Sequence, residues 1–306
     1  MKIAVVGGAG AMGGLFGGLL AKAGADVHLI DVVPSAIDAI NSDGLRIEDK
    51  AGAIETVRIK ATTDPASVGV ADLVIVFVKC YHTEDAIRNA APVIGDQTTV
   101  LSLQNGWGNA PRIQSIVGDK RVMAGVTYHS GVLLGPGHVQ HAGTGMSFVG
   151  ELDGADSDRL HRIAALFGEA GIETTPSTDV ITQIWSKLAL NICTLPTSAL
   201  LRFYAGQLVE HDGTLELMRG LLREGVAVAN AQGIALDFDE RWEAITGLLK
   251  RAAKGKASML QDVEKGRRTE IDVINGAIVA AGQRLNIPTP HNQTMVWMVK
   301  ALEETF

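Results

Sequence analysis

Short apolar runs in the first half of the chain alternate with helical patterns. Runs over residues 3–6, 26–31, 73–78, 99–103 and 121–128 predict strands, and helices are expected up to residue 23 and over 35–41 and 81–91. Residues 73–78 are all apolar, which is typical of a strand covered on both faces. Segments 45–48 and 54–60 are expected to form an inserted hairpin. This alternation predicts a doubly wound, mainly parallel sheet.

The second half of the chain changes character beyond Pro176, where almost no strand pattern remains. Helical patterns cover residues 179–194, 213–232, 240–253 and 269–285, and a last helix follows Pro290. We therefore expect an α/β protein of two domains. Residues 1–175 would form a domain built on the parallel sheet. Residues 176–306 would form an all-helical domain.

Composition narrows the classes of partner. The chain has 306 residues and a net charge of −7, with no dense basic run, so nucleic acid is not an expected partner. Residues 3–21 carry no charge but contain seven glycines, so we expect neither a secretory leader nor a membrane span. Two cysteines, Cys80 and Cys193, cannot make a disulfide framework, which favours a cytoplasmic protein.

A glycine-rich motif follows the first predicted strand and opens the first predicted helix. Its residues are Gly8, Ala9, Gly10, Ala11, Met12 and Gly13, in the pattern G-x-G-x-x-G. In such motifs the first glycine permits a tight turn, the second lets the backbone approach a pyrophosphate, and the third lets the helix pack on the strand. The helix N-terminus then binds the anion. The motif predicts a dinucleotide site, with a purely structural turn as the alternative.

An acidic residue ends the second predicted strand. Asp31 lies 23 residues after Gly8, where a carboxylate can bind the ribose hydroxyls and repel a 2′-phosphate. No Lys or Arg occurs from Val32 to Leu45 to receive such a phosphate. These residues favour NAD(H) over NADP(H), unless Asp31 only caps the next turn.

A polar stripe marks the first helix of the second half. Gln183, Lys187, Asn191 and Thr194 recur at helical spacing, and Lys187 is the only charge between Val180 and Leu201. The stripe either faces solvent or lines a buried cleft. Glu270 is expected on the apolar face of a later helix, where a carboxylate needs a partner such as Lys187. A lysine so held could donate a proton to an alkoxide formed by hydride transfer.

Two further polar residues follow predicted parallel strands. Lys79 comes directly after residues 73–78, and Asn105 comes directly after residues 99–103. Ligands bind at this end of parallel strands in doubly wound sheets. Both residues are therefore candidates for the site, although either could simply be a turn residue.

Taken together, these segments resemble the ketopantoate reductase family. The matching segments are Lys2–Gly18, Val78-Lys79, Gln104-Asn105-Gly106, Trp185–Asn191, Ser258–Asp262, Thr269–Asp272 and Asn275-Gly276. They span nearly the whole chain in family order. The most specific feature is a serine and a glutamate twelve residues apart, Ser258 and Glu270.

The resemblance implies a Rossmann domain, a helical C-terminal domain and reduction of 2-dehydropantoate (ketopantoate) to pantoate. It implies that Lys187 donates the proton, that Asn191 and Ser258 contact the substrate, and that Asn105 lies between cofactor and substrate. Lys79 and Glu270 would lie at the cofactor side or brace the site. NADP(H) is the usual cofactor of the family, its members are often homodimers, and no metal is expected.

The chain departs from the family pattern at two asparagines. An Asn-Pro pair is replaced by Leu195-Pro196, and an Asn-Gly pair is replaced by Ala205-Gly206. An apolar site prefers an apolar side chain, so a second reading is an NAD-linked D-2-hydroxyacid dehydrogenase of the mandelate type. A third reading, from another class, is a dinucleotide-binding sensor without turnover.

Overall fold

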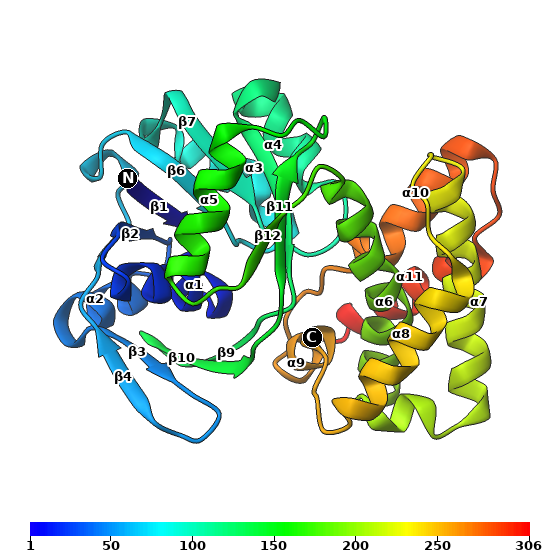
Figure 1. Ribbon diagram of the computed structural model, residues 1–306. Helices are drawn as coiled ribbons and strands as arrows, with labels where there is room; N and C mark the ends of the chain where they lie inside the picture. Colours follow the sequence, from blue (N-terminus) through cyan, green and yellow to red (C-terminus); the bar gives the residue numbers. More distant parts are fainter. The chain divides into compact units, whose positions relative to one another are not determined.

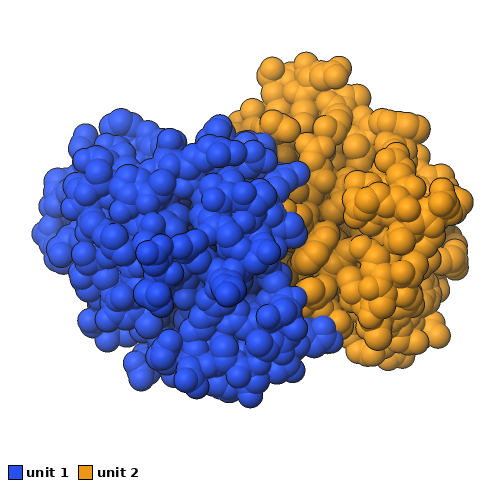
Figure 2. Space-filling model, turned by 90° about the horizontal axis from the view of Figure 1, so that it is seen from above, with its two compact units in different colours: residues 1–104, 109–180 blue, residues 105–108, 181–306 orange.

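The structure is a computed structural model that describes residues 1–306, and the chain divides into two units (Figure 2). The first unit contains residues 1–104 and 109–180, and the second contains residues 105–108 and 181–306. The division therefore falls after residue 180 rather than 175, and a four-residue loop of the first half belongs with the helical unit.

An eight-stranded sheet forms the centre of the first unit (Figure 1). Its strand order is β12-β11-β8-β7-β6-β1-β2-β5, and all pairs are parallel except β8 with β11. The strands are β1 (Lys2–Val6), β2 (Asp26–Ile30), β5 (Lys60–Thr62), β6 (Ala71–Val76), β7 (Ile94–Ser102), β8 (Val122–Thr127), β11 (Ser147–Glu151) and β12 (Thr174–Pro176). The expected doubly wound α/β fold is confirmed, with one antiparallel pair near its edge.

Helices cover both faces of this sheet. Helices α1 (Ala11–Lys22), α2 (Pro34–Asp43) and α5 (Asp158–Glu169) share one apolar core with the inward side chains of β1, including Ile3 and Val5. Phe16 of α1 contacts Phe167 of α5 in this core. Helices α3 (Thr83–Asn89) and α4 (Asn109–Val117) contact each other and lie outside that core.

A second sheet explains the glycines of α1. Strands β3 (Leu45–Glu48), β4 (Ile54–Val57), β9 (Ser130–Gly135) and β10 (His138–Gly143) form a sheet in the order β4-β3-β10-β9, which packs on α1. A Cβ at Gly17 would lie 2.5 Å from Leu29 of the large sheet, and one at Gly18 would lie 2.6 Å from Ile47 of the small sheet. The uncharged stretch 3–21 thus comprises most of β1, the glycine loop and most of α1, and α1 packs between the two sheets. The predicted hairpin over 54–60 ends earlier, because Lys60 pairs with the large sheet in β5.

The second unit is all-helical, as expected. Its helices are α6 (Val180–Leu201), α7 (Asp212–Asn230), α8 (Phe238–Arg251), α9 (Ser258–Glu264), α10 (Asn275–Leu285) and α11 (Pro290–Glu303). The core of this unit includes Trp185, Leu188 and Ile192 of α6 and Leu221 and Leu222 of α7. No helix in the chain has both the length and the apolar character that a bilayer crossing needs.

Two helix boundaries differ from the expected ones. Helix α6 continues past residue 194 to Leu201 and contains Pro196. The helix expected over 269–285 begins only at Asn275, because Ile274 has φ −97° and ψ −98° and interrupts it. Glu270 therefore precedes a three-residue 3₁₀ turn (Ile271–Val273), and the prediction that it lies on a helix face is wrong.

Candidate functional site

The glycine-rich loop joins β1 to α1 over residues 7–10. The left-handed backbone needed for the turn occurs at Gly7, with φ +83°, and not at Gly8 as expected. A Cβ at Gly8 would lie 2.7 Å from the Cβ of Leu29, so this glycine permits close approach to β2. A Cβ at Gly13 would lie 2.2 Å from the carbonyl oxygen of Gly7, which requires glycine for close packing of helix and loop.

The loop fits a dinucleotide phosphate group. Gly10 is the N-cap of α1 and supplies no side chain that would cap the first amides of the helix. Backbone N–H groups at an uncapped helix N-terminus bind anions, and the helix dipole adds to that attraction. Ala9, Ala11 and Met12 present no polar side chain that could compete for them.

Asp31 directly follows β2 and contacts this loop. Its Oδ2 accepts a hydrogen bond from the Ala9 amide at 3.0 Å, and its Oδ1 accepts one from the Val33 amide at 3.3 Å. Asp31 therefore both braces the phosphate loop and begins the next turn. The two residues after Asp31, Val32 and Val33, are exposed apolar residues rather than cations.

Lys187 of α6 is held by an amide from a distant part of the chain. Its Nζ donates a hydrogen bond to Oδ1 of Asn105 at 2.9 Å. Burial lowers the pKa of the Lys187 ammonium from its ordinary value of 10.5 to about 8, and the negative charge of Glu270 opposes this decrease. Glu270 is itself buried, with 8% of its surface exposed. The result is an amine that can exchange a proton near neutral pH.

The loop that carries Asn105 rests on the segment that follows Glu270. The Trp107 amide donates to the Val273 carbonyl at 2.9 Å. Gly106 has φ +79°, and a Cβ there would lie 2.3 Å from the same carbonyl oxygen. Only glycine permits this approach, so the Asn105 loop and the segment 270–275 are held in contact.

The polar stripe of α6 is largely buried rather than solvated. Asn191, one turn beyond Lys187, is 6% exposed. Thr194 is also buried, and its hydroxyl donates to the Leu190 carbonyl of its own helix at 2.9 Å. Gln183, at the start of the stripe, is partly exposed, so the buried part of the stripe lies toward its C-terminal end.

No hydrogen bond within the helical unit joins Ser258 to Lys187, and Lys79 belongs to the other unit. Ser258 is exposed at the start of α9. Lys79 does not directly follow a strand as expected, because β6 ends at Val76 and two residues, Phe77 and Val78, separate the strand from Lys79. Lys79 instead precedes a 3₁₀ turn over Cys80–His82, and its carbonyl accepts from the His82 amide at 2.8 Å.

Sequence reasoning missed a network behind the Asn105 loop. Gln104 donates through Nε2 to the Val78 carbonyl at 2.9 Å and to the Thr83 hydroxyl at 2.8 Å. Thr83 in turn donates to Asn109 Oδ1 at 3.2 Å. These bonds join the ends of β6 and β7 to the starts of α3 and α4. The only sequence feature that could have indicated this network was the polar run Gln104-Asn105-Gly106, in which Gln104 had been given no role.

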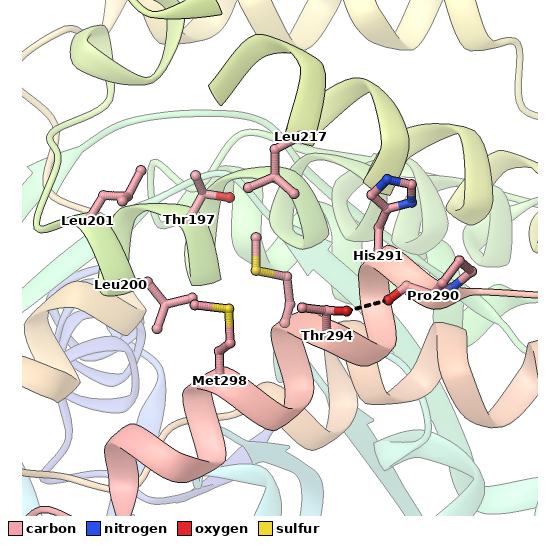
Figure 3. Close-up of a pocket in the computed structure, with 9 residues that line it drawn as sticks. Thr197, Leu200, Leu201, Leu217, Pro290, His291, Thr294 and Met298 are labelled. Carbon is pink, nitrogen blue, oxygen red and sulfur yellow. Dashed lines mark hydrogen bonds between the residues drawn. The ribbon is translucent and has the colours of Figure 1, made fainter. Parts of the chain in front are cut away.

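A cavity of about 320 Å³ lies elsewhere in the helical unit (Figure 3). Side chains from α6, α7 and α11 line it, namely Thr197, Leu200, Leu201, Leu217, Pro290, His291, Thr294, Met295 and Met298. None of the predicted site residues contributes to it, and its lining is almost entirely apolar.

Two family models match the chain. The model described as ketopantoate reductase PanE/ApbA matches residues 3–154, and the corresponding C-terminal model matches residues 179–303. Among curated proteins, a 2-dehydropantoate 2-reductase from Pyrococcus horikoshii is 36% identical over 303 residues, which cover 99% of this chain and 98% of the relative.

The chain is similar to solved structures of a ketopantoate reductase and of a D-mandelate dehydrogenase. A PanE/ApbA family ketopantoate reductase from Ralstonia eutropha JMP134 has a TM-score of 0.91 and 36% identity, covering 100% of this chain and 99% of that one. A D-mandelate dehydrogenase solved with NADH and anilino(oxo)acetate has a TM-score of 0.95 and 27% identity, with coverage of 100% and 99%.

Proposed function

The chain belongs to the ketopantoate reductase family, and from that premise we propose that it reduces the carbonyl of a 2-oxo acid with Lys187 as the proton donor. The chain is an oxidoreductase, as its curated relatives are, which sets aside the reading as a sensor without turnover. The observation that carries the proposal is the buried Lys187 amine, bonded to Asn105 and under the influence of Glu270.

Each residue of the cluster has a distinct task. When bound, the reduced nicotinamide supplies the hydride that adds to the carbonyl carbon. The Lys187 ammonium donates its proton to the carbonyl oxygen as negative charge develops there, a contribution of about 10²–10⁴-fold in rate. Asn105 accepts a hydrogen bond from Lys187 and fixes its direction. Glu270 favours the charged amine, so that it is protonated at neutral pH.

The substrate-binding role of Asn191 is supported by its burial beside Lys187 on α6. We propose from the family resemblance alone that Ser258 contacts the substrate and that Lys79 lies at the cofactor side. The segment Gly8–Gly13 and Asp31 are proposed to bind the cofactor. The carboxylate of Asp31 against the Ala9 amide supports NAD(H) over NADP(H).

Two kinds of 2-oxo acid are candidate substrates for this site. The family resemblance favours 2-dehydropantoate. The replacement of two family asparagines by Leu195 and Ala205 favours a bulkier apolar 2-oxo acid, and the structural likeness to a D-mandelate dehydrogenase supports the same reading. A site that hydrogen-bonds a substrate hydroxyl discriminates far more strongly than an apolar one, so the two readings predict different substrate ratios.

The deciding assay follows oxidation of NADH and of NADPH with 2-dehydropantoate, phenylglyoxylate and 2-oxoisovalerate. Strong turnover of 2-dehydropantoate would support the first reading and show that other residues replace the lost asparagines. Preference for phenylglyoxylate with NADH would support the second. The Leu195→Asn, Ala205→Asn double variant should then shift the kcat/KM ratio toward 2-dehydropantoate by at least about tenfold. Leu285→Asn, the same change at an exposed position on α10, is the matched control.

The role of Lys187 needs a separate test. Lys187→Ala should lower kcat by at least about a hundredfold while the dissociation constant for the cofactor stays unchanged. Unchanged turnover would remove Lys187 from the mechanism.

We further propose that the protein forms a homodimer in the cytoplasm. Trp297 of α11 is 65% exposed, and exposed aromatic surface beside an apolar cavity is typical of an interface. Sedimentation should show a dimer that Trp297→Glu weakens. Neither Cys80 nor Cys193 forms a disulfide, which agrees with a reducing compartment.

A further inference from the structure

Helix α6 contains a proline whose missing hydrogen bond is replaced by a side chain. Pro196 has no N–H, so the carbonyl of Ile192, four residues earlier, loses its helical donor. Nδ2 of Asn275 donates to that carbonyl at 3.0 Å. Both groups are fully buried, so water cannot take the place of the amide. The continuation of α6 through a proline therefore depends on a residue from α10.

The orientation of the Asn275 amide is fixed by a second bond. Its Nδ2 also donates to Oδ1 of Asn292 at 3.0 Å. Asn292 donates through its own Nδ2 to Glu224 Oε2 at 2.8 Å, and Glu224 also accepts from the amides of His291 and Asn292. A buried chain of polar groups thus links α7, α11, α10 and α6, and within it each bond strengthens the next.

This network carries a free-energy penalty that packing alone would not require. Oδ1 of Asn275 is buried and has no hydrogen-bond partner. A buried oxygen without a donor is destabilising, and an apolar side chain of similar size would avoid it. Retention of an amide here points to a requirement for its donor group rather than for its volume.

Asn275 links the three parts of the candidate site, namely α6, the segment 270–275 and the Asn105 loop. On one side it bonds to Ile192, the residue after Asn191 on the helix that carries Lys187. On the other side it ends the segment that begins with Glu270. That same segment holds the Asn105 loop through the bond from Trp107 to Val273.

We propose that Asn275 is a positioning residue, which locks α6 to the segment 270–275 so that Glu270 and Asn105 keep their places around Lys187. The inference rests on the proposed role of Lys187 as proton donor. Asn275 makes no hydrogen bond to Lys187 and acts through the Ile192 carbonyl. Displacements of about 1 Å in such clusters can cost about 10²-fold in rate.

The test combines loss of the amide with restoration of the helical bond. Asn275→Ala should lower kcat at least about tenfold with a smaller change in KM. The pKa of Lys187 can be read from the pH dependence of its competitive acetylation by mass spectrometry. This pKa should move by about half a unit or more, because the burial of Lys187 and its distance from the Glu270 carboxylate would both change. Pro196→Ala restores a backbone N–H for Ile192 and should by itself be nearly neutral. In the Asn275→Ala background it should recover much of the activity and return the Lys187 pKa toward its original value.

Controls separate positioning from stability. Leu249→Ala truncates a buried side chain of α8 outside the network and should lower stability without moving the Lys187 pKa. If Asn275→Ala behaves in the same way, or if Pro196→Ala gives no rescue, the inference is overturned. The acetylation measurement does not depend on turnover. Failure of the proposed function would appear instead as an active Lys187→Ala variant, and the two failures are therefore distinguishable.

Discussion

Replacement of Lys187 by methionine should stabilise the protein while it abolishes turnover. The pKa of the Lys187 ammonium is lowered from 10.5 to about 8 by burial. At about 1.4 kcal/mol for each pH unit, a charged amine at this place costs about 3 kcal/mol of folding free energy at pH 7. Loss of the hydrogen bond to Asn105 offsets about 1 kcal/mol of that gain. The net expectation for Lys187→Met is a stabilisation of about 2 kcal/mol.

The pH dependence of this difference has a definite sign. Between pH 8 and pH 10.5 the unfolded chain still binds the Lys187 proton and the folded chain has lost it, so folding stability of the original protein rises with pH in this window. The penalty is fully present below pH 8 and disappears above pH 10.5. The advantage of Lys187→Met should therefore be largest at pH 6–7 and should shrink toward pH 10.

Tryptophan fluorescence during urea unfolding is a suitable assay. All four tryptophans, Trp107, Trp185, Trp242 and Trp297, lie in the helical unit that contains Lys187. The signal therefore reports the unfolding of this unit alone. A Lys187→Met protein that is less stable at pH 7, or whose free-energy difference does not vary with pH, would refute the reasoning.

Three further predictions concern the cofactor loop and the charge near Lys187. Glu270→Gln removes a charge that raises the pKa of Lys187, so the alkaline decline of the reduction rate should begin at lower pH in a pH–rate profile. Asp31→Asn removes the charge that repels a 2′-phosphate, and the kcat/KM ratio of NADPH to NADH should rise at least about tenfold in steady-state assays. Gly13→Ala places a Cβ 2.2 Å from the Gly7 carbonyl oxygen and should weaken cofactor binding at least about tenfold by fluorescence titration. Gly168→Ala on α5, where a Cβ meets nothing within 4 Å, should leave binding unchanged.

The first unit was largely predictable because its signals are local. Residues 73–76 of the buried parallel strand β6 are a continuous apolar run, and the glycine motif lies between a strand and a helix. The dense glycines of α1 were visible, but their reason was not. A sequence shows that Gly17 and Gly18 are small, and only the structure shows a sheet packed on each side of them.

The helical unit was less predictable because distant contacts override local rules there. Pro196 predicts a helix end, yet α6 continues because Asn275, 83 residues away from Ile192, supplies the missing donor. The helix expected through Glu270 is interrupted at Ile274, where the preceding carbonyl of Val273 accepts from Trp107 instead of from its own helix.

The candidate site was found in part from residue type and spacing. A lone lysine in an apolar helix and an asparagine at a strand end pointed to Lys187 and Asn105, which are bonded in the structure. Glu224 and Asn292 were missed, and Asn275 was noted only within a family motif and given no role, because polar residues spaced along helices normally indicate a solvated face. Their burial depends on how four helices pack, which no single segment encodes.

The two departures from the family pattern share one feature that bears on the substrate. In each pair the asparagine is replaced and its neighbour, Pro196 or Gly206, is retained. Pro196 creates the vacancy that Asn275 fills, and Gly206 is pressed against Ala253, where a Cβ would lie 2.8 Å from the alanine Cβ. Ala205 holds its place through a backbone bond to the Gly255 carbonyl, which any residue could make.

Pro196 and Gly206 are thus retained where the backbone depends on them, and Leu195 and Ala205 replace the asparagines with apolar side chains that pack against the core of the helical unit. A family member that had lost its function would be expected to lose both kinds alike. Retention of the scaffold together with Lys187 and Asn105 is the pattern of an active enzyme, and the two apolar replacements are the reason to test a more apolar 2-oxo acid beside 2-dehydropantoate.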